Sequence, residues 1–175
     1  MPYLRVCPLS RLPETLEGSG ARHLMTLMKV GTAISRPAGI AEGRHCVVEV
    51  SDIVVPMDGH VTPGDGHVAA ILAFAEAWDR KEPLLIHCYA GISRSTAAAY
   101  IAACALAPER AEAEIARALR IASPSATPNA LFVSIADRLL GRDGRMVAAI
   151  AEIGRGADAF EGEPFSLNLK SNVRI

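Results

Sequence analysis

The chain has 175 residues, half of them hydrophobic, and a formal net charge of −1. This length fits one domain with a substantial core, and the balanced charge argues against broad nucleic-acid binding, which needs a basic excess. No basic segment followed by a long apolar core opens the chain, and the longest apolar run, 96–107, is too short to cross a bilayer. We therefore expect a soluble, cytoplasmic protein that binds neither nucleic acid nor membrane.

Strands and helices alternate in the first half of the chain. Short, apolar and partly β-branched runs predict strands at 22–28 and 45–50. Between the second strand and the next lies a helix at 67–78, whose apolar residues recur at helical spacing, with Asp65 or Gly66 as its cap. A buried strand follows at 84–88. No motif is found in the first forty residues.

Helices alone are predicted after that strand. The first is 95–107, and Pro108 lies in the first turn of the next, which carries acidic residues early and basic residues late. A third helix opens at Thr127-Pro128 and ends before Gly141. Asp143 is expected to cap the last one.

This order of elements predicts an α/β fold. Its central sheet should be mainly parallel and flanked by helices on both faces, with a helical C-terminal half. We expect residues 1–175 to form a single domain with its core at 20–155 and a C-terminal tail at 156–175 that shows no period.

The segment HCYAGISRS, residues 87–95, carries the chemistry. Ligands of open α/β sheets bind beyond the carboxyl ends of the strands, and this loop leads from such an end into a helix N-terminus that attracts anions. Gly91 permits a turn in which successive amides point inward, and Arg94 offers two phosphate oxygens a planar fork of donors. These surroundings favour a thiolate at Cys88, which can attack phosphorus. The other cysteines, Cys7, Cys46 and Cys104, lack metal-type spacing and are expected to be free thiols.

The same nine residues resemble the H-C-x5-R-[S/T] signature of the cysteine-based protein tyrosine phosphatases. The stretch 51–122 is similar to the central part of the small dual-specificity phosphatases, and the chain resembles their bacterial type. Pro128-Asn129, ahead of a helix that contains Phe132, resembles their P-N-x-x-F element. The resemblance implies a protein tyrosine phosphatase that needs no cofactor or metal and passes through a cysteinyl-phosphate.

The resemblance also implies the roles of the loop residues. Cys88 would be the nucleophile and Arg94 a phosphate ligand, and Ser95 would hydrogen-bond the sulfur and help it leave, unless Ser95 is only an ordinary first-turn residue. His87 would orient the loop. The rest of the loop would bind phosphate, sulfate or vanadate together with His87 and Arg94: Tyr89, Ala90, Gly91, Ile92 and Ser93.

A general acid is implied on a movable loop ahead of the cysteine. Asp52 is preferred, because Val55 and Pro56 follow it at the offsets of the W-P-D-x-G-V-P loop of larger tyrosine phosphatases, although Val50-Ser51 replace W-P and Val54 replaces the glycine. Asp58 is the alternative, because its distance from Cys88 is closer to the dual-specificity pattern.

The substrate stays open at this point. A phosphorylated protein or peptide is the first hypothesis; a catalytically silent phosphate-binding module and a phosphatase for a small metabolite or lipid are the alternatives. The loop has no lysine of the kind that phosphoinositide phosphatases place there. The repeated Asp-Gly-His at 58–60 and 65–67 suggests a metal site, but turns explain it and no third ligand follows. The sequence predicts no oligomeric state.

Overall fold

The computed structural model describes residues 2–170. Within this range five strands form one sheet in the order β3-β2-β4-β1-β5. Neighbouring strands among β1 to β4 run parallel, and β5 runs antiparallel to β1 at one edge. The strands are β1 (Tyr3–Pro8), β2 (His23–Met28), β3 (His45–Glu49), β4 (Leu84–Cys88) and β5 (Phe165–Asn168).

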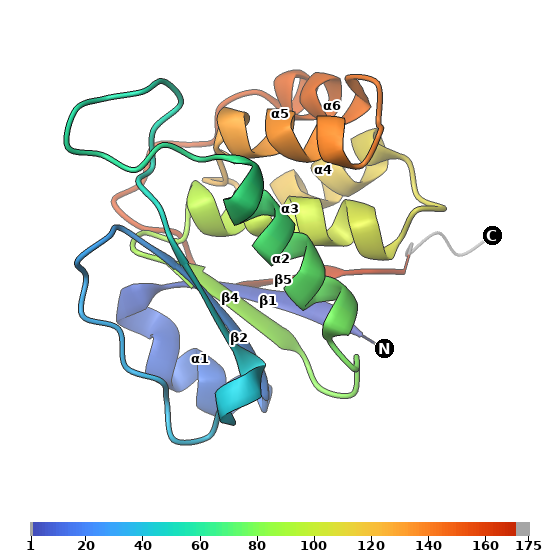
Figure 1. The fold of residues 1–175 in the computed structure, drawn as a ribbon. Coiled ribbons are helices and arrows are strands. Elements are labelled where there is room, and N and C mark those ends of the chain that lie inside the picture. Colours follow the sequence, from blue (N-terminus) through green and yellow to red (C-terminus); the bar gives the residue numbers. More distant parts are fainter. Residues whose placement is uncertain (1, 171–175) are drawn as a thin grey trace.

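Helices cover both faces of the sheet (Figure 1). One face packs against α1, which shares a small apolar cluster with Leu24 and Leu85, and the opposite face carries the larger core beneath the other helices. Almost every residue of α3 is buried, and its alanine-rich sequence lets it lie close to its neighbours. The helices are α1 (Leu12–Ser19), α2 (Asp65–Ala77), α3 (Arg94–Leu106), α4 (Glu112–Ala122), α5 (Ala130–Leu139) and α6 (Arg145–Ile153), with short 3-10 turns at Leu9–Arg11 and Glu42–Arg44.

The predicted α/β fold with a mainly parallel sheet is therefore confirmed, and its core extends beyond 20–155. The first strand, β1, lies inside the sheet between β4 and β5, and β5 comes from the predicted tail. Neither has a sequence signal, because β1 ends in a proline and β5 has only four residues. Residues 171–175 of that tail lie outside the described range. No helix within 2–170 combines the length and apolar character needed to cross a membrane.

Four helix starts differ from the sequence predictions. The helix expected to open at Thr127-Pro128, α5, begins at Ala130 and has Asn129 as its cap. Pro108 is not in a helix, because Arg110 N–H closes a turn on the carbonyl of Ala107 at 3.0 Å and α4 begins four residues after the proline. The cap of α2 is Gly64 rather than Asp65 or Gly66, and Asp65 is the first helical residue.

The start of α6 is capped from a distance. Asp137, on α5, accepts hydrogen bonds from the backbone N–H groups of Gly144 and Met146, both at 2.7 Å, so Asp143 is not the cap. A long-range contact of this kind leaves no local pattern in the sequence.

Candidate active site

The signature loop, residues 88–94, joins the end of β4 to the start of α3. Four carbonyl groups of this loop point outward and accept hydrogen bonds from backbone N–H groups of other segments. The pairs are Leu9 N to Tyr89 O (3.0 Å), Gly162 N to Ala90 O (2.8 Å), Thr127 N to Ile92 O (2.9 Å) and Asn129 N to Ser93 O (3.3 Å).

The orientation of the carbonyls fixes that of the amides. In a trans peptide the N–H of the next residue points opposite to the carbonyl, so the amides that follow these four carbonyls point toward the inside of the loop. One of them, Gly91 N–H, donates to Cys88 Sγ at 3.2 Å. Inward amides at a helix N-terminus form a concave surface that attracts anions.

Gly91 allows the loop to approach β1 closely. Its φ is +69°, and a Cβ built there would lie 2.7 Å from the backbone nitrogen of Pro8, at the end of β1. No side chain fits at that distance. The glycine therefore serves both the left-handed turn and the close contact between the loop and a central strand.

Arg94 lies at the first position of α3 and is almost fully buried. Its Nη1 donates to the carbonyl of Val50 at 3.1 Å, which fixes the plane of the guanidinium group. Its Nε has no partner among the described residues. A buried, unpaired donor is costly, so this side of the guanidinium group is ready to bind an anion.

Ser95 is fully buried directly after Arg94. Its Oγ lies 3.1 Å from Cys88 Sγ. The contact fits the predicted interaction with the sulfur, and it is more specific than an ordinary first-turn position requires.

Asp52 reaches the signature loop from the end of β3. Its Oδ1 accepts hydrogen bonds from Ser93 Oγ at 2.7 Å and from Asn129 Nδ2 at 2.9 Å. Asn129 Nδ2 also donates to the carbonyl of Ile53 at 3.1 Å. These contacts hold the carboxyl group beside the loop and leave Oδ2 without a hydrogen-bond partner in the described part of the chain.

The segment 52–60 projects from a closed base, which separates the two candidate acids. The N–H of Ser51 donates to the carbonyl of Val61 at 2.9 Å, so the ends of this acid loop are joined. Asp52 lies at the base, next to the signature loop. Asp58 lies in an exposed turn and forms no hydrogen bond or ion pair with any residue of 2–170.

A solved structure shares this architecture. The crystal structure of DUSP15 superposes with a TM-score of 0.61 at 16% sequence identity, covering 87% of this chain and 91% of that one. OH1 from the Orf virus, described as a tyrosine phosphatase with triple substrate specificity, gives 0.42 at 19% identity, covering 87% of this chain and 83% of that one. No protein-family model and no curated protein sequence matches the chain. The fold is that of the dual-specificity phosphatases.

Within this phosphatase fold, the Nε2 atom of His87 is bound to the neighbouring strands of the sheet. This nitrogen lies 2.8 Å from Thr26 Oγ1 on β2, and that hydroxyl lies 2.8 Å from His45 Nε2 on β3. Burial lowers the pKa of His87 to about 4, so its ring is neutral near pH 7. The sequence analysis missed Thr26 and His45, because only strand pairing brings them beside His87.

Two further residues, Asn129 and Gly162, support the acid loop and the signature loop. Asn129 also caps α5 by accepting from Leu131 N–H and Phe132 N–H, so the P-N-x-x-F resemblance marks a residue that joins that helix to the acid loop. Gly162 comes from the predicted tail, and a Cβ on it would lie 2.8 Å from the carbonyl oxygen of Gly91. The tail therefore packs directly behind the signature loop.

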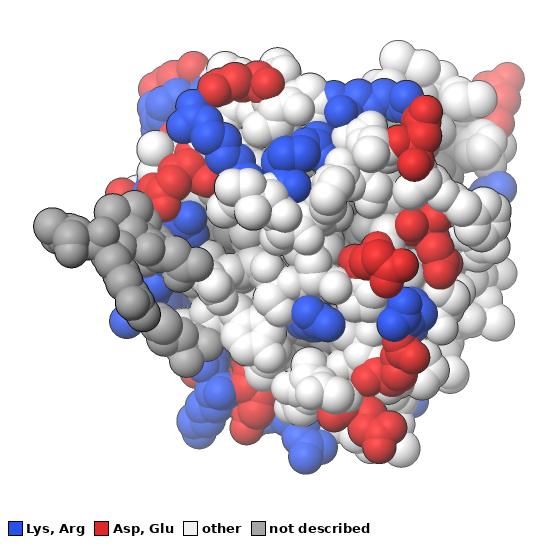
Figure 2. All heavy atoms as spheres, turned by 180° about the vertical axis from the view of Figure 1, so that it is seen from behind, with Lys and Arg blue, Asp and Glu red and all other residues white. Residues whose placement is uncertain are grey.

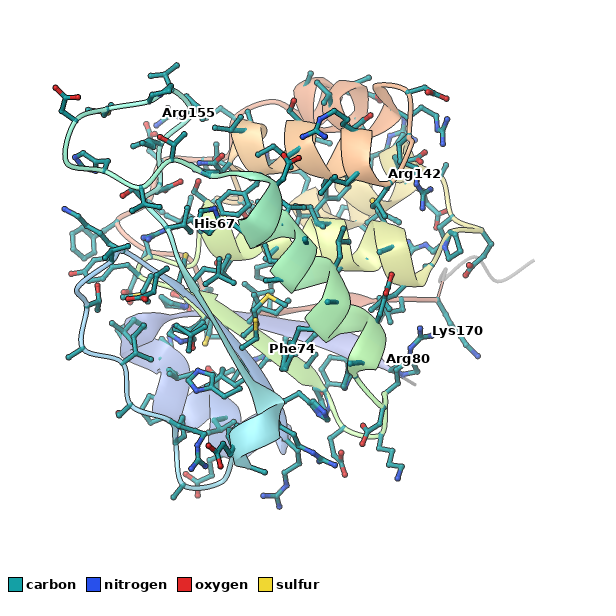
Figure 3. All side chains as sticks on the ribbon, in the orientation of Figure 1. His67, Phe74, Arg80, Arg142, Arg155 and Lys170 are labelled. Atoms are coloured by element: carbon teal, nitrogen blue, oxygen red, sulfur yellow. The ribbon has the colours of Figure 1, made fainter. Side chains whose placement is uncertain are left out.

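The second copy of the Asp-Gly-His motif, residues 65–67, has structural partners. His67, on the first turn of α2 (Figure 3), accepts a hydrogen bond at Nδ1 from Gly64 N–H at 3.0 Å. Asp65 pairs with Arg138 of α5. Across residues 2–170, no group of three or more His, Cys, Asp or Glu side chains is placed to hold a metal ion.

Proposed function

We propose that the protein hydrolyses phosphomonoesters through a cysteinyl-phosphate, as a protein tyrosine or dual-specificity phosphatase. One observation carries the proposal: Cys88 Sγ lies inside a loop whose amides point inward and whose Arg94 keeps an unpaired donor. A nucleophile at the base of an anion site is aimed at the phosphorus of a bound phosphate.

In the first step, the amides and Arg94 bind the phosphate oxygens, and the Cys88 thiolate attacks phosphorus. An S–P bond forms as the bond from phosphorus to the leaving oxygen breaks. Asp52 is the general acid in this proposal: its Oδ2 gives a proton to the leaving oxygen, while Ser93 and Asn129 hold Oδ1.

In the second step, water attacks the phosphocysteine. Asp52, now ionised, accepts a proton from that water, and the P–S bond breaks to release inorganic phosphate and the thiolate. Ser95 Oγ, 3.1 Å from the sulfur, donates a hydrogen bond that stabilises the departing thiolate.

The proposal is tested with p-nitrophenyl phosphate in the presence of a metal chelator. The wild-type protein should hydrolyse this ester. The Cys88→Ser variant should not, because a serine hydroxyl is not ionised near neutral pH. Cys46→Ser is the matched control, because Cys46 lies on β3, and it should keep wild-type turnover. A need for a divalent ion, or normal turnover by Cys88→Ser, would contradict the mechanism.

The same experiment separates a phosphatase from a silent phosphate-binding module. Cys88→Ser should still bind a phosphotyrosine peptide, since the amides and Arg94 are unchanged. Binding by the wild-type protein without turnover would favour the silent module.

A further inference from the structure

The edge of the sheet that holds the signature loop also carries exposed apolar side chains. The loops after the four parallel strands, β1 to β4, and the segment before the antiparallel β5 lie at this edge, on the left of Figure 1. We call six exposed apolar residues on the loops after β1, β3 and β4 and on the segment before β5 the apolar rim. They are Leu9, Val54, Val55, Met57, Tyr89 and Phe160.

The rim is unusual in how fully its side chains are exposed. Phe160 is 90% exposed, and Val55 and Tyr89 are each 60% exposed. Three of the six rim residues follow Asp52 on the acid loop, and Tyr89 follows Cys88 directly. Apolar surface gathered in this way around a polar site marks a place where a ligand is covered.

The charges at this edge balance. Five basic and five acidic side chains lie on its loops: Arg11, Lys29, Arg36, Arg94 and Arg155, against Asp52, Asp58, Asp158, Glu161 and Glu163. Arg11 is ion-paired with Glu163 at 3.1 Å and Arg155 with Asp158 at 2.6 Å, whereas Lys29 and Arg36, on the loop after β2, form no ion pair with any residue of 2–170. Arg94 is buried in the loop itself.

Other basic side chains lie far from this edge. Figure 3 shows Arg80, Arg142 and Lys170 on the opposite side of the molecule. On the face shown in Figure 2, the described acidic and basic side chains form small mixed groups separated by uncharged surface. An anionic membrane or a second phosphate group attracts a cluster of cations, so the balanced edge favours an uncharged surrounding for the bound phosphate.

We propose that the apolar rim selects phosphotyrosine peptides in which uncharged, apolar residues flank the phosphorylated residue. This inference rests on the proposed function, because the signature loop must first hold the phosphate. Side chains next to that phosphate then lie over the rim. There they cover apolar surface, whereas acidic side chains would bury no apolar surface.

The test compares two phosphotyrosine peptides that differ only in the residues flanking the tyrosine, valine and leucine in one and glutamate in the other. The full chain should show a kcat/KM about tenfold higher for the apolar peptide, which corresponds to partial covering of one or two rim side chains. Phe160→Glu and Val55→Glu should each reduce this ratio. Both side chains are exposed, so neither change removes a core contact.

Ile121→Glu is the matched control. Ile121 is 83% exposed on α4, away from the rim, and its substitution should leave the ratio of the two peptides unchanged. Equal kcat/KM values for the two peptides, or a ratio that Phe160→Glu and Val55→Glu do not change, would overturn the inference. So would faster hydrolysis of a short-chain phosphoinositide than of either peptide.

The outcome on p-nitrophenyl phosphate separates the two proposals. If the protein hydrolyses this small ester but shows equal kcat/KM for the two peptides, the rim inference is overturned and the proposed phosphatase activity stands. Absence of turnover on the ester and on both peptides would overturn the phosphatase itself.

Discussion

Among the four cysteines, surroundings rather than residue type decide reactivity. Burial raises the pKa of Cys7 to about 11 and that of Cys104 to about 12, so both stay protonated near neutral pH. Of the four cysteines, Cys88 lies in the signature loop, where its sulfur accepts a hydrogen bond from the backbone N–H of Gly91.

We expect iodoacetate at pH 7 to alkylate Cys88 before any other cysteine, because the loop binds the anionic reagent beside the sulfur. Peptide mass spectrometry after short exposure should find the label on Cys88, and vanadate should block it by filling the loop. Earlier labelling of Cys7, Cys46 or Cys104 would mean that the loop does not activate its cysteine.

The acid is tested through the leaving group. If Asp52 protonates the leaving oxygen, Asp52→Asn should lower kcat by about 100-fold or more for phosphotyrosine, in the range typical of general acid catalysis. It should matter far less for an ester whose leaving group needs no proton. The control is Asp58→Asn, on the same loop. Leaving-group dependence in Asp58→Asn alone would move the acid to Asp58.

The residues of the loop could be predicted from the sequence, but most of their partners could not. Cys88, Arg94 and Ser95 lie within one short segment, so their spacing was visible. The contacts that orient them come from afar: Val50 fixes Arg94, and Thr26 bonds His87 across the sheet. Such contacts depend on strand pairing and loop packing, which a local pattern does not encode.

At the scale of elements, the acid loop is tied to α5 through one residue. The side chain of Asn129 accepts from the first turn of α5 with its oxygen and donates to Asp52 and Ile53 with its nitrogen. A mutation can therefore remove the contact with Asp52 and keep the helix cap.

Asn129→Ser should keep the helix cap, because a serine hydroxyl also accepts from the first turn. It should lose the reach to Asp52, so kcat for phosphotyrosine should fall while the esters that need no acid are hydrolysed nearly as before. The melting temperature should change little. Ser93→Ala removes the other donor to Asp52 and should act in the same direction. Equal loss on both kinds of ester would mean that Asn129 acts on the loop as a whole rather than on the acid.

Strands and helices with a long or regular pattern of apolar residues could be predicted from the sequence, whereas elements of few residues could not. The strand at 84–88 and the helices after it were placed to within a few residues, because their apolar runs are long or regular. The loop supports at the two ends of the chain were missed: β1 contacts Gly91, and the segment before β5 supplies Gly162. Both terminal segments are short, and they contact the signature loop only once the sheet has formed.

For the molecule as a whole, the neutral His87 links stability to pH. His87 lies on β4 opposite Thr26 of β2, and burial lowers its pKa to about 4, while an unfolded chain has the ordinary value of about 6.5. Between these values the unfolded state binds more protons than the folded state. Stability is therefore fully present above about pH 6.5 and is lost as the pH falls toward 4.

We expect the free energy of unfolding to fall by up to about 3 kcal/mol over that interval from His87. Urea unfolding at pH 7.5, 5.5 and 4.5 measures it. His87→Gln keeps a polar group near Thr26 but does not titrate. The free energy of unfolding of this variant should therefore fall less between pH 7.5 and pH 4.5. Some decline should remain in the variant, because burial also lowers the pKa of His23 and His45. Parallel curves for the wild type and His87→Gln would show that His87 does not carry the pH dependence.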